Sequence, residues 1–120
     1  FQNAQKHLAE KGVIPQTVVE KESRFIAPLV AIWKFRAQNG KSYWVITGRL
    51  PTDHAEAGAA SNAREVLRYF SMQWQLKADQ LMQSGAVDKT KVDFANLLIN
   101  RAHGLYELFE KDEMWQNEPA

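Results

Sequence analysis

The sequence contains no cysteine, and this absence removes several classes of protein chemistry. Disulfide frameworks, thiolate nucleophiles and zinc sites built from cysteine are all excluded. Long hydrophobic runs are missing too. No segment approaches the roughly 18 consecutive apolar residues that a membrane-spanning helix requires, and no secretory hydrophobic region is present. We therefore expect a cytoplasmic protein that does not enter a membrane.

An excess of charge of either sign is also absent. Fifteen lysines and arginines face fourteen aspartates and glutamates, a formal net charge of +1. A few basic residues and one tyrosine do gather in the segment 34–49: Lys34, Arg36, Lys41, Tyr43 and Arg49. A cross-strand pair of Arg36 and Tyr43 explains this grouping simply, and the low net charge gives no long-range attraction to phosphate. Nucleic acid is not an expected partner.

The composition that remains is typical of a globular protein. Of 120 residues, 45% are hydrophobic and 24% are charged, and no repeat, low-complexity tract or linker-like segment interrupts them. A chain of this length builds one hydrophobic core rather than two. The sequence predicts a single domain over residues 1–120.

A β-hairpin is the clearest local prediction. Two β-prone segments, residues 29–37 and 42–48, flank Asn39 and Gly40. Asn-Gly between such segments is the strongest short-range hairpin signal, because both central positions of a type I′ turn require positive φ. We therefore expect a two-residue turn at these positions.

That turn would fix the pairing of the two strands. It pairs Phe35 with Trp44 and Trp33 with Ile46, and these four residues would form the core-facing side of the hairpin. The opposite face would carry residues that we expect to be at least half exposed: Arg36, Tyr43, Lys34, Val45 and Thr47.

Helical periodicity predicts three helices around this hairpin. They cover residues 1–11, 62–83 and 89–111, and the last two begin after the capping residues Asn62 and Asp88. The stretch after Pro15 fits either a short helical turn or an extended segment. The expected fold is α+β: an N-terminal helix, an antiparallel β-hairpin with a possible third strand at residues 17–20 or 24–28, and two long helices packed on the sheet.

Candidate chemistry is concentrated in the segment after the hairpin, where Asp53, His54 and Glu56 follow one another closely. These side chains could bind a metal ion or form an acid–base pair. Their spacing, however, matches no metal or triad pattern. We favour a capping role, in which Pro51 ends the strand and Thr52 or Asp53 caps a short helical turn closed by Glu56. On this interpretation no metal and no cofactor is expected.

Two residues of the helix 89–111 are further candidates. Arg101 falls on the apolar side, where it would either pair with a carboxylate or lay its stem along the apolar rim with the guanidinium in water. The candidate partners are Asp53, Glu56 and Glu65. His103 belongs to a polar ridge of Asn96, Asn100, His103 and Glu107, for which we favour a solvent-exposed helix face over a pocket.

The helix 62–83 carries a second apolar stripe, formed by Tyr69, Met72 and Leu76, roughly opposite its main apolar face. Such a stripe either lies inside the domain or contacts a partner. We expect it to form a homodimer interface, with the helix 1–11 or the segment around Trp115 as the alternative, intramolecular cover.

Three stretches resemble a family of small bacterial proteins classed as a domain of unknown function. They are YWVITGRLPTD, NAREVLRYFSMQWQLKA and FANLLINRAHGLYELF, and the resemblance extends from about His7 to Trp115. It implies a compact bacterial domain and assigns no activity, ligand or catalytic residue.

No nucleophile elbow, phosphate-binding glycine loop or metal motif is present. We therefore expect a non-enzymatic binding or protein-interaction module, with a protein or a second copy of the chain as partner. The alternative is a small hydrolase or metal-dependent enzyme at Asp53, His54 and Glu56, assisted by Arg101 or His103. Convergence of these side chains in a concave pocket would favour the enzyme.

Overall fold

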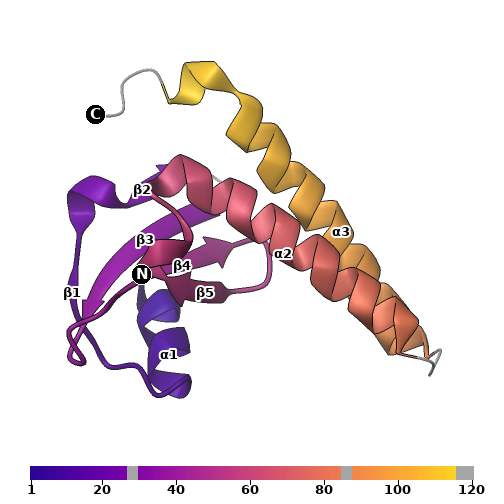
Figure 1. Ribbon diagram of the computed structural model, residues 1–120, viewed down its shortest axis with the longest axis horizontal. Coiled ribbons are helices and arrows are strands. Elements are labelled where there is room, and N and C mark those ends of the chain that lie inside the picture. The colour runs from indigo at the N-terminus through magenta and orange to yellow at the C-terminus, as the bar shows by residue number, and fades with distance from the viewer. Residues whose placement is uncertain (27–29, 85–87, 116–120) are drawn as a thin grey trace. The chain divides into compact units, whose positions relative to one another are not determined.

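The computed structural model describes residues 1–26, 30–84 and 88–115 (Figure 1). Their helices and strands, in chain order, are α1 (Gln2–Glu10), β1 (Pro15–Val18), β2 (Arg24–Ile26), β3 (Val30–Ala37), β4 (Ser42–Gly48), β5 (Asp53–Glu56), α2 (Ala63–Gln83) and α3 (Lys89–Glu110). The α+β class is confirmed, with an N-terminal helix, an antiparallel sheet and then two long helices.

The chain divides into two compact units, Phe1–Val66 and Leu67–Ala120. We call them the N-terminal unit and the helical unit and describe each by itself. The expectation of a single domain stays a prediction.

The sheet of the N-terminal unit has five strands, in the order β1-β3-β4-β5, with β2 pairing with β3 as well. All pairs are antiparallel. Both candidate third strands are real: β1 overlaps residues 17–20, and β2 lies within residues 24–28, of which residues 27 and 28 are outside the described part. The stretch from Pro15 is therefore extended, and only Glu20–Glu22 form a 3₁₀ turn.

The hairpin of β3 and β4 exists, but its turn differs from the prediction. The Ala37 amide donates to the Lys41 carbonyl at 2.9 Å, and the Gly40 amide donates to the Ala37 carbonyl at 3.1 Å. The loop therefore has three residues, with Gly40 at a φ of +85°. Among the described residues only glycines have positive φ, so Asn39 does not, which excludes the type I′ turn. A three-residue loop of this kind is a type I turn followed by a glycine bulge.

The extra loop residue moves the pairing by one position. Phe35 lies opposite Tyr43, Lys34 opposite Trp44 and Arg36 opposite Ser42. Directly opposed residues share a face, and a shift of one residue exchanges the faces of a strand. The predicted pairs of Phe35 with Trp44 and of Arg36 with Tyr43 are therefore wrong.

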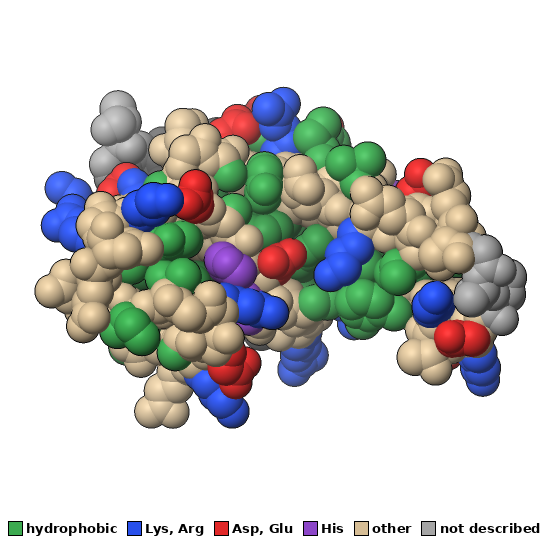
Figure 2. Space-filling model, turned by 60° about the horizontal axis from the view of Figure 1, so that its bottom comes forward, with side chains coloured by type: hydrophobic (Ala, Val, Ile, Leu, Met, Phe, Trp, Pro, Cys, Tyr) green, Lys and Arg blue, Asp and Glu red, His purple; other side chains and the backbone are tan. Residues whose placement is uncertain are grey.

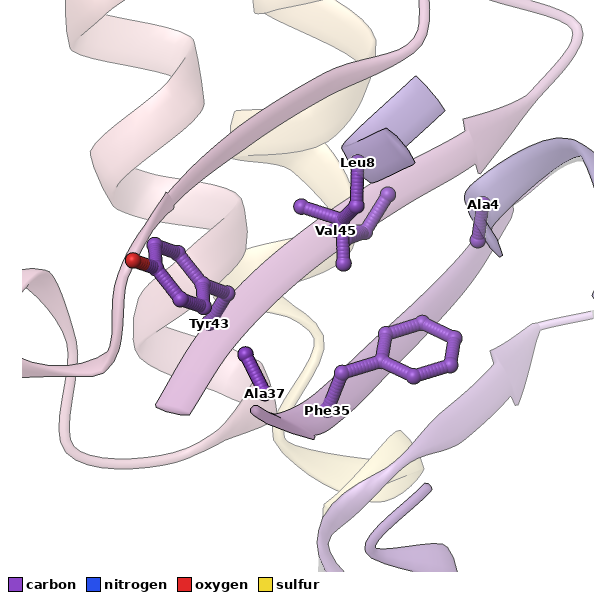
Figure 3. Packing of buried hydrophobic residues seen from close by; sticks show 6 residues of the cluster. All are labelled: Ala4, Leu8, Phe35, Ala37, Tyr43 and Val45. Atoms are coloured by element: carbon purple, nitrogen blue, oxygen red, sulfur yellow. The ribbon is translucent and has the colours of Figure 1, made fainter. Parts of the chain in front are cut away.

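The consequence is that β4 is buried on both sides. Its five residues from Tyr43 to Thr47 are all buried, so the expected half-exposed face is wrong for β4, whereas on β3 Arg36 is exposed and Lys34 is half-buried. One face packs against α1 in a cluster shown in Figure 3: Ala4, Leu8, Phe35, Ala37, Tyr43 and Val45. On the other face Trp44 is 1% exposed, and its indole N–H is shared between the carbonyls of Ala57 and Ala60.

The segment after Pro51 is a strand, not the predicted capped helical turn. Asp53–Glu56 pair with β4, and His54 lies opposite Val45. The 3₁₀ turn Ala57–Ala59 follows it, and no side chain caps that turn. The capping interpretation is wrong because the outer edge of β4 offers backbone hydrogen bonds to this segment, and their pattern makes it a strand.

The helical unit consists of α3 and all but the first turn of α2. Both predicted caps are confirmed: the Asn62 side chain accepts from the Glu65 amide, and the Asp88 side chain accepts from the Lys91 amide. The two helices run side by side (Figure 1). The Ser71 hydroxyl of α2 donates to the Ala102 carbonyl of α3 at 2.8 Å. Trp115 folds back as expected, with its indole N–H donating to the Leu108 carbonyl.

Candidate functional site: a histidine pair with a carboxylate

The first component of the site is His7, which α1 directs toward the sheet. Ala4 and Leu8 are one helical turn apart and fully buried in the cluster of Figure 3. His7 follows Ala4 by three positions and precedes Leu8, so it lies at the margin of the same helix face. Its side chain is half-buried.

The second component is His54 on β5. Because His54 lies opposite Val45, and Val45 belongs to the α1-facing cluster, its imidazole lies on the side of the sheet that α1 covers. His7 Nε2 and His54 Nδ1 are 2.9 Å apart, within hydrogen-bond distance. The two rings meet edge to face, with centroids 5.0 Å apart. The fold thus joins two residues separated by 47 positions.

The third component is Asp53. Neighbouring strand residues point to opposite faces, yet the Asp53 carboxylate stays beside His54, whose backbone N–H donates to Asp53 Oδ1 at 2.8 Å. One candidate ligand atom from each of His7, Asp53 and His54 lies within 4.8 Å of the other two. All three side chains are half-buried, so they are held in place and still reach solvent. Figure 2 shows histidine atoms at the molecular surface, with acidic and basic side chains beside them.

The surroundings favour the uncharged form of His7. Burial lowers its pKa below the ordinary value of 6.5, and His54 lowers it further. Asp53 and Glu10 act in the opposite direction, and Lys11 adds to the lowering. Two neutral imidazoles can share one hydrogen bond, since each has one donor and one acceptor nitrogen. Neutral imidazole is also the form that binds metal ions.

The spacing of the two nitrogens fits a metal site. At metal–nitrogen distances of about 2.0–2.1 Å, adjacent nitrogens lie about 2.9 Å apart in octahedral geometry and about 3.3 Å apart in tetrahedral geometry. The observed separation of 2.9 Å matches the first and needs a small opening for the second. Two imidazoles and one carboxylate form a donor set that suits iron, cobalt, nickel, copper or zinc rather than calcium or magnesium.

Of the three neighbouring residues singled out in the sequence, the structure keeps two in this cluster. Glu56 forms an ion pair with Lys41 at 3.1 Å, and both side chains are well exposed. His7 takes the place that Glu56 held in the sequence-based hypothesis.

The two candidates on α3 belong to the helical unit. His103 is exposed, as are Asn96, Asn100 and Glu107, so the polar ridge is the solvent-exposed face that we favoured. Arg101 is partly exposed, and its guanidinium donates to Asn100 Oδ1. Complete burial of Arg101 is therefore excluded.

Sequence reasoning missed His7 because nothing local marks it. The available signal was its position: an imidazole next to the apolar stripe of an amphipathic helix, in a chain with three histidines. Such a residue faces whatever the helix packs against. Identifying its partner required the pairing of β5 with β4, which the sequence did not predict.

The N-terminal unit also contains a pocket of about 370 Å³, which does not include the histidine site. It is lined by Phe1, Val18, Glu20, Ser23, Arg24, Phe25 and Trp33. Its walls are mainly apolar, and Phe25 is two-thirds exposed. Among the described residues that line the pocket there is no cluster of metal-ligating side chains, so the histidine site remains the better candidate for chemistry.

A protein-family model for a domain of unknown function, DUF4826, matches residues 1–115. The chain belongs to this family. The match covers both α1 and β5, so all three residues of the histidine site lie within the DUF4826 domain. No curated protein and no solved structure matches the chain. Among the described residues of this DUF4826 protein, no helix is long and apolar enough to cross a membrane.

Proposed function

We propose that this protein binds a divalent transition-metal ion through His7, Asp53 and His54. The observation that carries the proposal is the convergence of two imidazole nitrogens and a carboxylate from two elements far apart in the sequence. Each residue type is a common metal ligand, and the pair of nitrogens already has a suitable separation. The proposal departs from the sequence-based expectation that no metal binds, and it is closer to the alternative of a metal-dependent site that includes Asp53 and His54.

Metal binding requires that the proton shared between the two histidine rings move to another nitrogen. In the hydrogen-bonded pair one of the two facing nitrogens carries the proton, whereas a metal ion needs the lone pair of each. The donor ring must therefore carry its proton on its other nitrogen when the metal is bound. This tautomer change keeps both imidazoles neutral.

Hydrolysis is a second candidate function, and the number of ligands supports it. Three protein ligands leave at least one coordination position for water, the arrangement found in catalytic rather than structural metal sites. Metal-dependent hydrolysis that is absent from the metal-free protein would support this candidate. Binding without activity would leave the binding module.

The test of the proposal is metal titration of the full chain, purified without a histidine tag. We expect cobalt(II) or zinc(II) to bind at one equivalent, measured by calorimetry and by elemental analysis after dialysis. His7→Gln and His54→Gln should each weaken metal binding by at least about 10-fold. Loss of a residue that only hydrogen-bonds to a metal ligand already costs about this much, and loss of the ligand itself should cost no less. His103→Gln is the matched control, because His103 is exposed on α3, and it should bind as the wild type does.

Two results would contradict the proposal: no binding near one equivalent, or equal affinity in the wild type and in the His7→Gln variant. A folding control accompanies the titration. Metal at 100 times the wild-type Kd should stabilise the wild type by about 2.7 kcal/mol and the His7→Gln variant, whose affinity is at least about 10-fold weaker, by no more than about 1.4 kcal/mol.

A further inference from the structure

One side of α2 carries six residues in a regular stripe, of which the first two are half-buried and the other four exposed: Glu65, Tyr69, Met72, Leu76, Asp79 and Gln83. Their spacings of four, three, four, three and four keep them on one side of the helix. This side lies opposite Trp74, which is 1% exposed, whereas Met72 and Leu76 are 52% and 56% exposed. We call these six residues the α2 stripe.

The sequence offered two segments that could cover the α2 stripe within one chain, α1 and the segment around Trp115, and both have their apolar side chains packed elsewhere. The apolar face of α1 is used by Ala4 and Leu8 in the cluster with Phe35 and Val45. Trp115 is itself buried and bonded to the Leu108 carbonyl. Met72 and Leu76 stay exposed among the residues that the structure describes.

The order of residue types along the α2 stripe points to a second copy of the same chain. A two-fold axis at the level of residue 74 would run α2 antiparallel to its copy, so that residue 72 faces residue 76 of the other chain. Met72 then meets Leu76 twice at the centre, where apolar contacts are best shielded from water. At the next level Tyr69 meets Asp79, a phenol donor facing a carboxylate acceptor.

The outermost level follows the same rule. Glu65 meets Gln83, whose amide can donate to the glutamate carboxylate. Gln83 already reaches Asp79 in the same helix, with Nε2 donating at 3.1 Å, so the polar end of the stripe is ordered. Every pair across the axis is chemically matched.

A parallel arrangement lacks this match. It would place Asp79 against Asp79 and Glu65 against Glu65, and like charges directly opposed are destabilising. We therefore propose that α2 forms an antiparallel homodimer interface through the α2 stripe, with Met72 and Leu76 at its centre. This proposal stands independently of the metal site.

The first measurement is sedimentation of the full chain over a concentration series. We expect a monomer–dimer equilibrium for the wild type and a folded monomer for the Met72→Glu, Leu76→Glu double variant. A Gln73→Glu, Gln80→Glu variant is the matched control, because it adds two charges at exposed α2 positions outside the stripe and should still dimerise. A wild type that stays monomeric, or a double variant that unfolds, would overturn the proposal.

The second measurement determines whether the two α2 helices run parallel or antiparallel, by disulfide cross-linking. Because the chain has no native cysteine, only the introduced cysteines can form a disulfide. A mixture of the Tyr69→Cys and Asp79→Cys variants should form an intermolecular disulfide, because these positions face each other in the antiparallel pair. Tyr69→Cys alone should not, since two copies of residue 69 would lie about 15 Å apart along the axis, beyond disulfide reach. Efficient cross-linking of Tyr69→Cys alone would show a parallel pair and overturn the proposal.

Discussion

Strand β4 and helix α2 differ in how completely their apolar side chains are buried. Every residue of β4 from Tyr43 to Thr47 is buried, whichever face it lies on. In α2 the side that carries Trp74 is buried, and the side that carries Met72 and Leu76 is exposed. A change in β4 must therefore act on the fold, whereas a change on the α2 stripe can act on association alone. The proposed metal site lies on β5, the neighbour of β4, and the proposed dimer interface lies on α2.

The largest effect expected from this comparison is the loss of a β4 core residue. Trp44→Ala should destabilise the protein by about 3–5 kcal/mol, because it empties a buried site and removes the indole N–H that the carbonyls of Ala57 and Ala60 share. Leu76→Ala should change stability by less than about 0.5 kcal/mol at monomer concentrations, because Leu76 is exposed. Denaturant unfolding measures both.

A second β4 variant sharpens the same test. Tyr43→Ala should also be strongly destabilising, on the order of 3 kcal/mol, because Tyr43 is 6% exposed and packs toward α1. If Trp44→Ala is strongly destabilising and Tyr43→Ala is not, only one face of β4 is buried in the core. That result would contradict the observed register and support the pairing expected for a two-residue turn.

The prediction of this register from the sequence failed for a definable reason. Asn-Gly marks both a two-residue type I′ loop and a three-residue loop in which the glycine forms a bulge. The two differ by one residue, and one residue exchanges the faces of a strand. The unbroken apolar run from Tyr43 to Ile46 was the better guide, since a strand buried on both sides does not alternate.

The helices were predictable because their signals are local. Asn62 and Asp88 form the expected caps three residues before the amides that they accept from, and both long helices begin and end within about one residue of the prediction. The candidate site was only partly predictable. Asp53 and His54 were identified, whereas His7 lies 47 positions from its partner and required the β4–β5 pairing.

Two glycines, Gly40 and Gly104, allow the backbone conformation to be tested by substitution, with a smaller expected effect on stability than the β4 variants. Gly40 in the turn before β4 has a φ of +85° and open space around it, so Gly40→Ala should destabilise the protein by about 1–2 kcal/mol through backbone strain alone. Gly104 in α3 also has open space but no positive φ. Gly104→Ala should therefore stabilise the protein by about 0.5–1 kcal/mol.

Thermal or denaturant melts of variants at Gly40 and Gly104 test the glycine bulge of the hairpin loop and the space around Gly104 in α3. Gly40→Val should be at least as destabilising as Gly40→Ala, because a β-branched residue resists positive φ more strongly. Unchanged melting of both Gly40 variants would contradict the glycine bulge. Destabilisation by Gly104→Ala would show that α3 has no room at this position.

The smallest effect expected is the pH dependence that His7 confers on the metal-free protein. Burial and the nearby His54 hold the pKa of His7 below 6.5, so between the two pKa values the unfolded chain binds more protons than the folded one. The contribution of neutral His7 to stability is complete above pH 6.5. It decreases as the pH falls through 6.5 toward the lower pKa of the folded protein.

Unfolding free energies at pH 7.5 and 5.5, measured in the presence of a chelator, give this dependence as a difference between variants. The wild type should lose more stability on acidification than the His7→Gln variant, in which position 7 cannot titrate. His103→Gln should retain the wild-type loss, because His103 is exposed on α3. Equal losses in the wild type and the His7→Gln variant would show that burial and the nearby His54 do not hold the imidazole of His7 neutral. The chelator keeps metal binding out of the comparison, so this outcome is independent of the metal titration.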